Sequence, residues 1–180
     1  MTLLIDAIRR GDANVVAQLL RACADVNAET ESGDTPLSIA AMTRQTTAAM
    51  IIDLIGSGAK LETKSNDGFT PLMNAANFGN VEAVRVLLSR GADIKAGEDF
   101  NGKRGWPSLV FAARNQHADV VSMLVNHDAD LETRHKHGLT ALMLAAGASN
   151  VKAVEILLRH SPKLEAKNDD DQRRMTSQTR

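Results

Sequence analysis

The feature that most constrains this chain is a segment that recurs five times along it. Anchored on one leucine, the copies fall at Leu4, Leu37, Leu72, Leu109 and Leu142, which gives spacings of 33, 35, 37 and 33 residues. Four copies read GDTPLSIAA, GFTPLMNAA, PSLVFAA and GLTALMLAA, and the first, LLIDAI, fits the register more loosely. Such a period predicts one supersecondary unit per repeat, stacked on its neighbours to share a continuous core.

Each copy carries the signals of two helices joined by a turn. Threonine stands where an N-cap is expected in three copies, and proline follows at the first helical position in two: Thr35, Thr70 and Thr140, then Pro36 and Pro71. Gly58 and Gly91 supply a left-handed C-cap to the second helix. Cys23, Asp128 and Ser161 replace that glycine, so we expect those three helix ends to be less well terminated.

These residues resemble the ankyrin repeat, a unit of about 33 residues with a T-P-L-H-x-A signature. Within the chain the best match is residues 68–95, GFTPLMNAANFGNVEAVRVLLSRGADIK, and the resemblance covers about residues 2–168. It implies an all-α ankyrin-repeat solenoid of stacked helix-turn-helix units joined by β-hairpin loops. Aromatic residues make up only 3% of the chain, which favours a core built from leucine and small side chains.

The expected organisation is one ankyrin domain, residues 1–168, followed by a polar tail or cap at 169–180. The repeats fall at approximately 1–31, 32–66, 67–103, 104–136 and 137–168. Repeat two has two extra residues between its helices, so a longer turn is expected there. In repeat five, Leu144 stands where a following repeat would pack, and the tail is too polar to supply that repeat. Three explanations of this end remain open: a short amphipathic cap, self-association through the C-terminal face, or a chain cut from something longer.

One loop departs from the period. Asp93 and Leu109 are 16 residues apart, whereas the corresponding Asp130 and Leu142 are 12 apart. The four additional residues predict an extended hairpin at 96–107, between repeats three and four. It carries aromatic and basic side chains suited to an interface, including the only tryptophan, Trp106. The alternative is that Trp106 folds back over the groove and staples the loop.

The resemblance implies a non-catalytic module, an adaptor or inhibitor that binds a partner protein through its concave groove and the extended hairpin. One alternative is an immunity or antitoxin-type protein that neutralises a toxin or enzyme, and another is a structural homo-oligomer built through the C-terminal face. The candidate partner-binding residues are Met42, Phe69, Asn77, Phe78, Phe100, Lys103, Arg104, Trp106, Arg114, Asn115, Lys136 and His137. Phe69 and Phe78, in the central repeat, are predicted to face solvent as anchors; the alternative is that they pack on neighbouring repeats.

Other classes of function are disfavoured by composition and motifs. The net charge is −1 and each third of the chain is nearly balanced, which argues against nucleic-acid binding. No phosphate-binding loop, nucleophile elbow or metalloprotease motif is present, and His127, His135 and His137 are irregularly spaced, so we expect no catalytic residue, cofactor or metal. We expect an unidentified protein partner, no membrane and a possible weak homodimer through the C-terminal repeat. The expected location is cytoplasmic, or inside a host cell if the protein comes from a pathogen that delivers it there.

Overall fold

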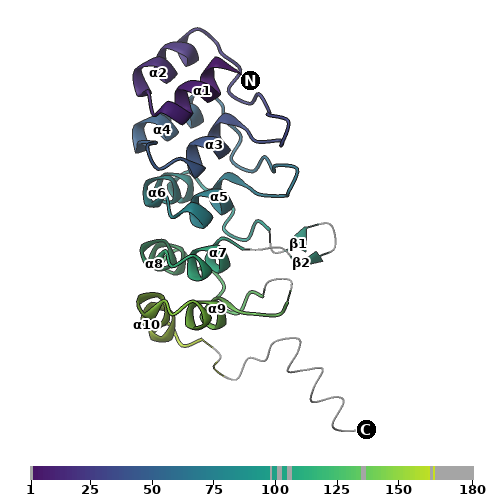
Figure 1. The fold of residues 1–180 in the computed structure, drawn as a ribbon, viewed down its shortest axis with the longest axis vertical. Helices are drawn as coiled ribbons and strands as arrows, with labels where there is room; N and C mark the ends of the chain where they lie inside the picture. The colour runs from purple at the N-terminus through teal and green to yellow at the C-terminus, as the bar shows by residue number, and fades with distance from the viewer. Residues whose placement is uncertain are drawn as a thin grey trace.

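The computed structural model describes residues 2–97, 99–100, 103–104, 107–134, 137–162 and 164, with the backbone alone described at 99, 100, 103 and 104. These residues form five helix pairs: α1 (Leu3–Arg10) with α2 (Ala13–Arg21), α3 (Pro36–Met42) with α4 (Ala48–Gly56), α5 (Pro71–Phe78) with α6 (Val81–Ser89), α7 (Ser108–Arg114) with α8 (Ala118–Val125), and α9 (Ala141–Gly147) with α10 (Val151–Arg159). The pairs stack in chain order into an elongated body (Figure 1). The predicted all-α repeat solenoid is therefore confirmed.

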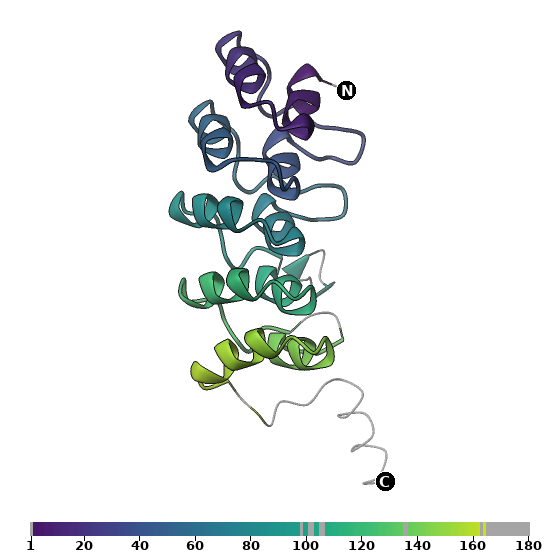
Figure 2. The ribbon, with the colours of Figure 1, turned by 60° about the vertical axis from the view of Figure 1, so that its left-hand side comes forward.

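The body has two layers and one fringe of loops. The odd-numbered helices form the inner layer, beside the loops that connect one repeat to the next, and the even-numbered helices form the outer layer (Figures 1 and 2). Within the described residues the only strands are β1 (Asp99–Phe100) and β2 (Lys103–Arg104), which lie in the loop between repeats three and four. We call the surface made by the loops and the inner helices the inner face.

Threonine starts four of the five inner helices, as the sequence predicts for three of them. The hydroxyl oxygens of Thr35, Thr70 and Thr140 accept hydrogen bonds from backbone amides three residues later, at 3.3 to 3.4 Å. Thr2 does the same for α1 at 3.4 Å, although the first repeat lacks the full motif. Each bond satisfies one of the amides that the first turn of a helix leaves free.

The core is a continuous column of leucine and small residues. The anchoring leucines of the first four repeats are between 1% and 3% exposed, and the alanines at 40, 41, 75, 76, 112 and 113 are fully buried. Since alanine adds only a methyl group, inner helices of neighbouring repeats approach closely along this column. A large side chain at one of these alanines would separate two repeats.

In repeats three to five, the side chain at the start of the outer helix bonds the repeat to the one before it. The Oδ1 atom of Asn80 accepts from the backbone amide of Ala83 at 3.0 Å and so caps α6. Its Nδ2 atom donates to the carbonyl oxygen of Thr43 in the preceding repeat at 3.1 Å. Asn150 likewise caps α10 and donates to the carbonyl oxygen of Ala113 at 3.4 Å. One amide group thus serves both the helix and the repeat interface.

Two of the three helix ends that lack glycine are formed as completely as those that have it. The residues after the outer helices are all left-handed, with φ of 94° at Gly58, 82° at Gly91, 57° at Cys23, 61° at Asp128 and 54° at Ser161. The amide of Cys23 donates to the carbonyl of Leu20 at 3.1 Å, and the amide of Asp128 to that of Val125 at 3.1 Å. The expectation of poorer termination is wrong in geometry for Cys23 and Asp128, where the penalty is instead about 1–2 kcal/mol of backbone strain at each residue. It holds for Ser161, because Pro162 has no amide to donate the second closing bond that Ala24 and Ala129 donate at the other two ends.

Repeats three and four differ most in how their helices begin and end. In repeat three, Thr70 and Asn80 cap the two helix starts and Gly79 and Gly91 adopt the left-handed conformation at the two helix ends. The corresponding residues of repeat four are Pro107 and His117, which give no side-chain cap, and Gln116 and Asp128, which are left-handed without being glycine. Repeat three therefore has the favoured residue at all four positions and repeat four at none.

The longer turn expected in repeat two is present. Helix α3 ends at Met42 and α4 begins at Ala48, whereas α5 and α6 are separated only by Gly79 and Asn80. The extra residues pack against the first repeat, because a Cβ atom at Gly11 would lie 3.0 Å from the Cβ atom of Gln45. The insertion therefore fills space at the first repeat interface.

Candidate partner-binding surface

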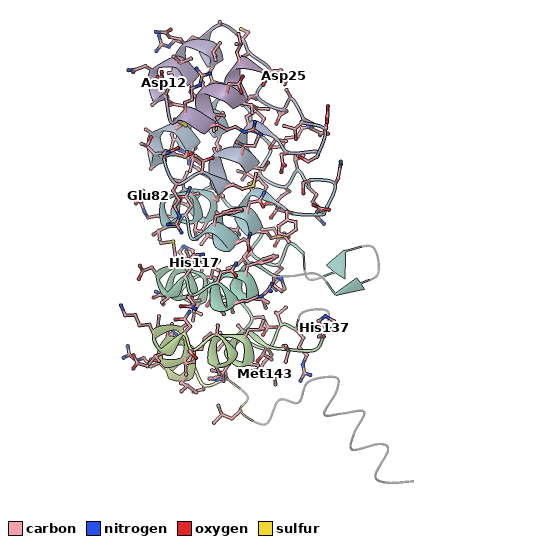
Figure 3. The ribbon with its side chains drawn as sticks, in the orientation of Figure 1. Asp12, Asp25, Glu82, His117, His137 and Met143 are labelled. Carbon is pink, nitrogen blue, oxygen red and sulfur yellow. The ribbon has the colours of Figure 1, made fainter. Side chains whose placement is uncertain are left out.

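The candidate residues lie in two bands on the inner face. Met42, Asn77, Phe78, Arg114 and Asn115 stand at the ends of α3, α5 and α7, and we call them the helix-end band. The loop band contains Phe69, His137 and the loop that carries β1 and β2; Figure 3 shows His137 on the loop side of the stack. An inner helix of eight residues separates the bands by about 12 Å. The structure thus divides the predicted site instead of gathering it.

Phe78 is the exposed ring of the helix-end band. It is the last residue of α5 in the central repeat, and 42% of its surface is accessible. Among the described side chains it is the only aromatic residue among the exposed large hydrophobic ones. Met42 lies in the same band one repeat earlier and is half-buried. The prediction that Phe78 faces solvent is confirmed.

Phe69 does not face solvent as predicted. It is half-buried, and its ring packs against that of Phe111 in the next repeat, with 5.1 Å between the centroids and 35° between the planes. Phe111 is only 5% exposed. A tilted pair of this kind contributes about 0.5–1.5 kcal/mol beyond the area it buries. Phe69 therefore stabilises the junction between repeats three and four.

Asn77 and Asn115 are engaged with each other across the same junction. The Nδ2 atom of Asn115 donates to Oδ1 of Asn77 at 2.7 Å and approaches its carbonyl oxygen at 3.1 Å. His117 adds a bond from Nε2 to that carbonyl at 3.1 Å, so Nε2 carries the proton. His117 is not among the residues predicted from the sequence. Its position identifies it, because Asn80 in repeat three and Asn150 in repeat five stand at the same place in the repeat.

The extended loop forms a hairpin at the backbone level. Strands β1 and β2 pair antiparallel, with Asp99 opposite Arg104 and Phe100 opposite Lys103. The two residues between them in the sequence are Asn-Gly, a pair favoured in two-residue hairpin turns that the sequence analysis overlooked. Among the predicted contact residues, Trp106 and Lys136 lie outside the described residues, as do the side chains of the four strand residues.

Neighbouring loops are bonded to each other on the N-terminal half of the inner face. The side chain of Asn27 accepts from the amide of Lys60 and donates to the carbonyl of Gly58, both at 3.0 Å. The side chain of Asn66 donates to the carbonyl of Glu31 at 2.9 Å. These bonds join loops 31 to 35 residues apart in sequence, so the loops form one continuous rim.

A hollow of about 490 Å³ lies between the first loop and α1. Its wall includes Glu29, Glu31 and Ser32 from the loop, and Ile5 and Arg9 from the helix. These loop residues are not among the candidate partner-binding residues, although the run ETES at 29–32 is acidic and polar. The inner face is therefore recessed beside the first repeat.

The described residues contain no group of three side chains placed to hold a metal ion. The Nδ1 atom of His127 is hydrogen-bonded to the carbonyl oxygen of Met123, one helical turn earlier in the chain, at 2.8 Å.

None of the helices in the described part of the chain combines the length and the apolar run needed to cross a bilayer. Arg114 and His137 are exposed on the inner face.

A stack of short helix pairs, bonded repeat to repeat and presenting a loop-fringed inner face, defines the class of repeat solenoids whose surface contacts other proteins. The family model described as ankyrin repeats (3 copies) matches residues 4–98 and again 94–169. The chain belongs to the ankyrin repeat family. Ankyrin repeats are in general protein–protein interaction modules and are typically non-catalytic.

Relatives share this repeat region and are much longer. The chain is 33% identical over 109 residues, 61% of its length, to ankyrin repeat and KH domain-containing protein mask-1 of Caenorhabditis elegans, of which it covers 4%. It is 35% identical over 89 residues, 49% of its length, to the protein mask of Drosophila melanogaster, of which it covers 2%. It is 33% identical over 131 residues, 72% of its length, to the B-cell lymphoma 3 protein homolog of Mus musculus, of which it covers 29%. The similarity therefore concerns the repeats alone.

Proposed function

We propose that this chain is a non-catalytic adaptor or inhibitor that holds a partner protein on its inner face, with Phe78 as the central anchor. The observation that carries the proposal is the 42% exposure of an aromatic ring at the middle of the stack. An exposed ring of this size is unfavourable in water, and such residues dominate binding energy when a partner covers them.

The residues around Phe78 support the anchor role. Met42, half-buried at the end of α3, adds a flexible apolar side chain one repeat away. Arg114, exposed at the end of α7, supplies a charged rim on the other side. Asn77 and Asn115 act first on the junction between repeats, and their mutual bonds hold the ends of α5 and α7 at a fixed separation.

The extended hairpin provides the second contact of the proposal. Its paired backbone at residues 99–100 and 103–104 projects from the loop side of the stack (Figure 1). We assign partner contacts there to Phe100, Lys103, Arg104 and Trp106, and to Lys136 and His137 in the next loop. A partner that touches both bands spans the inner helices.

Phe78→Ala is expected to weaken partner binding at least about tenfold, since truncation of a hot-spot aromatic costs 2 kcal/mol or more. The matched control is Ile52→Ala, because Ile52 is 40% exposed and lies in the outer helix α4. Both variants should keep the circular dichroism spectrum of the wild type. The tagged proteins are used to capture partners from source lysate, and the affinity of each identified partner is then measured with purified components.

The proposal requires a partner that binds wild type and Ile52→Ala alike and binds Phe78→Ala weakly. Equal affinity for all three proteins would refute the anchor role and leave a partner-binding role elsewhere on the surface. The identity of the captured protein decides between the adaptor reading and neutralisation of a toxin or enzyme. If no protein binds in a saturable way, the binding function itself is wrong.

A further inference from the structure

The C-terminal end of the stack exposes a surface that the other repeats bury or half-bury. We call it the C face, and it consists of Leu142 and Ala146 on α9 and Val154 and Leu158 on α10. Positions equivalent to Leu142 are 1–3% exposed in the other repeats (Leu4, Leu37, Leu72 and Leu109), and those equivalent to Ala146 are 0% exposed (Ile8, Ala41, Ala76 and Ala113). In repeat five, Leu142 and Val154 are only half-buried, Ala146 is exposed and Leu158 is 46% exposed. No charged residue lies at these four positions.

Residues 165–180 offer little apolar surface to match the C face. Residues 165–180 read EAKNDDDQRRMTSQTR, in which eight residues are charged and Met175 is the single large apolar one. Each internal repeat, in contrast, covers its predecessor with leucine, an alanine pair and the apolar side of an outer helix. Leu164, which also follows α10, is itself 69% exposed. Covering four apolar positions with one methionine would leave most of the surface in water.

The N-terminal end of a second copy is a poor mate for the C face, although it also exposes Leu3 and Val15. In the stacking of repeats three, four and five, the residue at the start of the outer helix donates to a carbonyl of the preceding repeat: Asn80, His117 and Asn150. Repeat one has Asp12 at this position, and its carboxylate only accepts hydrogen bonds. Head-to-tail stacking would bury this charge against carbonyl oxygens without a donor, which costs several kcal/mol.

We propose that the C face binds the C face of a second copy, giving a closed dimer with two-fold symmetry. An isologous contact places the uncharged apolar positions of both copies against each other and leaves Asp12 in solvent at the far ends. The edge of the C face on α10 carries exposed charges of both signs, Lys152, Glu155 and Arg159. Two copies can therefore approach each other without a rim made only of like charges that repel. Figure 3 places Met143 of α9 at this end of the stack. The dimer does not depend on the partner-binding proposal, because the inner face stays open.

Light scattering over a concentration series measures the association. The wild-type mass should rise from 19.3 kDa and level off at twice that value. Leu158→Glu, which places a charge on the C face, should remain at the monomer mass over the whole range. The matched variant Leu3→Glu, at a residue 74% exposed on the opposite end, should dimerise like the wild type. Ala146→Lys tests the same face from α9 and should also stay monomeric.

Each alternative gives a different result. In head-to-tail assembly the wild-type mass would keep rising with concentration, Leu3→Glu and Leu158→Glu would both be monomeric, and mixing them would restore a heterodimer. A wild-type protein that stays monomeric at every concentration overturns the proposal. This result is expected if the tail covers the C face. Circular dichroism establishes that each variant is folded, and loss of association in only one of the two C-face variants also counts against it.

Discussion

Asn80→Asp is expected to lower the free energy of unfolding by about 2–4 kcal/mol at neutral pH. The substitution keeps the Oδ1 acceptor that caps α6 through the amide of Ala83. It removes the Nδ2 donor and places a carboxylate at a position that is 7% exposed, beside the carbonyl oxygens of Ala40 and Thr43. Neither carbonyl gains a new donor, so the cost combines lost hydrogen bonds with desolvation of a charge. Urea unfolding followed by circular dichroism measures it.

Two related substitutions calibrate this effect. Asp12→Asn is expected to change stability by less than about 0.5 kcal/mol, because both residues cap helices well and no repeat precedes α1 in the described structure. Asn150→Asp should cost less than Asn80→Asp, since Asn150 makes one bond of 3.4 Å to the preceding repeat. Equal losses for Asn80→Asp and Asp12→Asn would show that the inter-repeat donation contributes nothing.

Gly79→Ala is expected to destabilise the protein by about 2–3 kcal/mol. Gly79 has a φ of 70°, which strains any residue with a Cβ atom. That Cβ would also lie 2.6 Å from Cε1 and 2.7 Å from Cγ of His117, so the ring would have to move away from the carbonyl of Asn77. The measurement is the same urea titration, with the slope checked against wild type.

Gly91→Ala is the control for the strain term. Gly91 has a φ of 82° but no atom within 4 Å of the position of its Cβ, so its substitution should cost about 1 kcal/mol. In the double variant Gly79→Ala/His117→Ala the collision is absent. The stability losses of the two single variants should therefore add up to more than the loss of the double variant. If Gly79→Ala and Gly91→Ala lose the same stability, the ring contact is not significant.

The sequence predicted what repeats and missed what joins one repeat to the next. The threonine caps, the turn of repeat two and the alanine column follow from local chemistry at fixed offsets, so one register locates them all. Phe69 was placed in solvent because the register of a single repeat contains no partner for it. Its partner, Phe111, lies 42 residues away and is a side chain that only this repeat carries at that position.

The candidate site shows the same limit. Sequence comparison among repeats identified variable positions but gave no measure of their separation along the helix axis, so two bands about 12 Å apart were treated as one site. It also gave no sign that Asn77 and Asn115 bond to each other, because the bond crosses from one repeat to the next. The left-handed Cys23 and Asp128 show that packing imposes a conformation that local preference disfavours.

The unfavoured helix termini of repeat four have a consequence for how the molecule opens. In a stack where each repeat touches only its neighbours, the total stability is the sum of the stabilities of the repeats and of the interfaces between them. The interior repeat with the lowest stability of its own is where cooperative unfolding breaks down. Repeat four lacks two caps and carries two strained residues, so much of its order comes from the junction formed by Phe69, Asn77 and His117. We expect backbone amides of α7 and α8 to exchange with solvent faster than those of α5 and α6; equal protection would contradict this. The array then behaves as a block of three repeats with its last two units attached through a softer link.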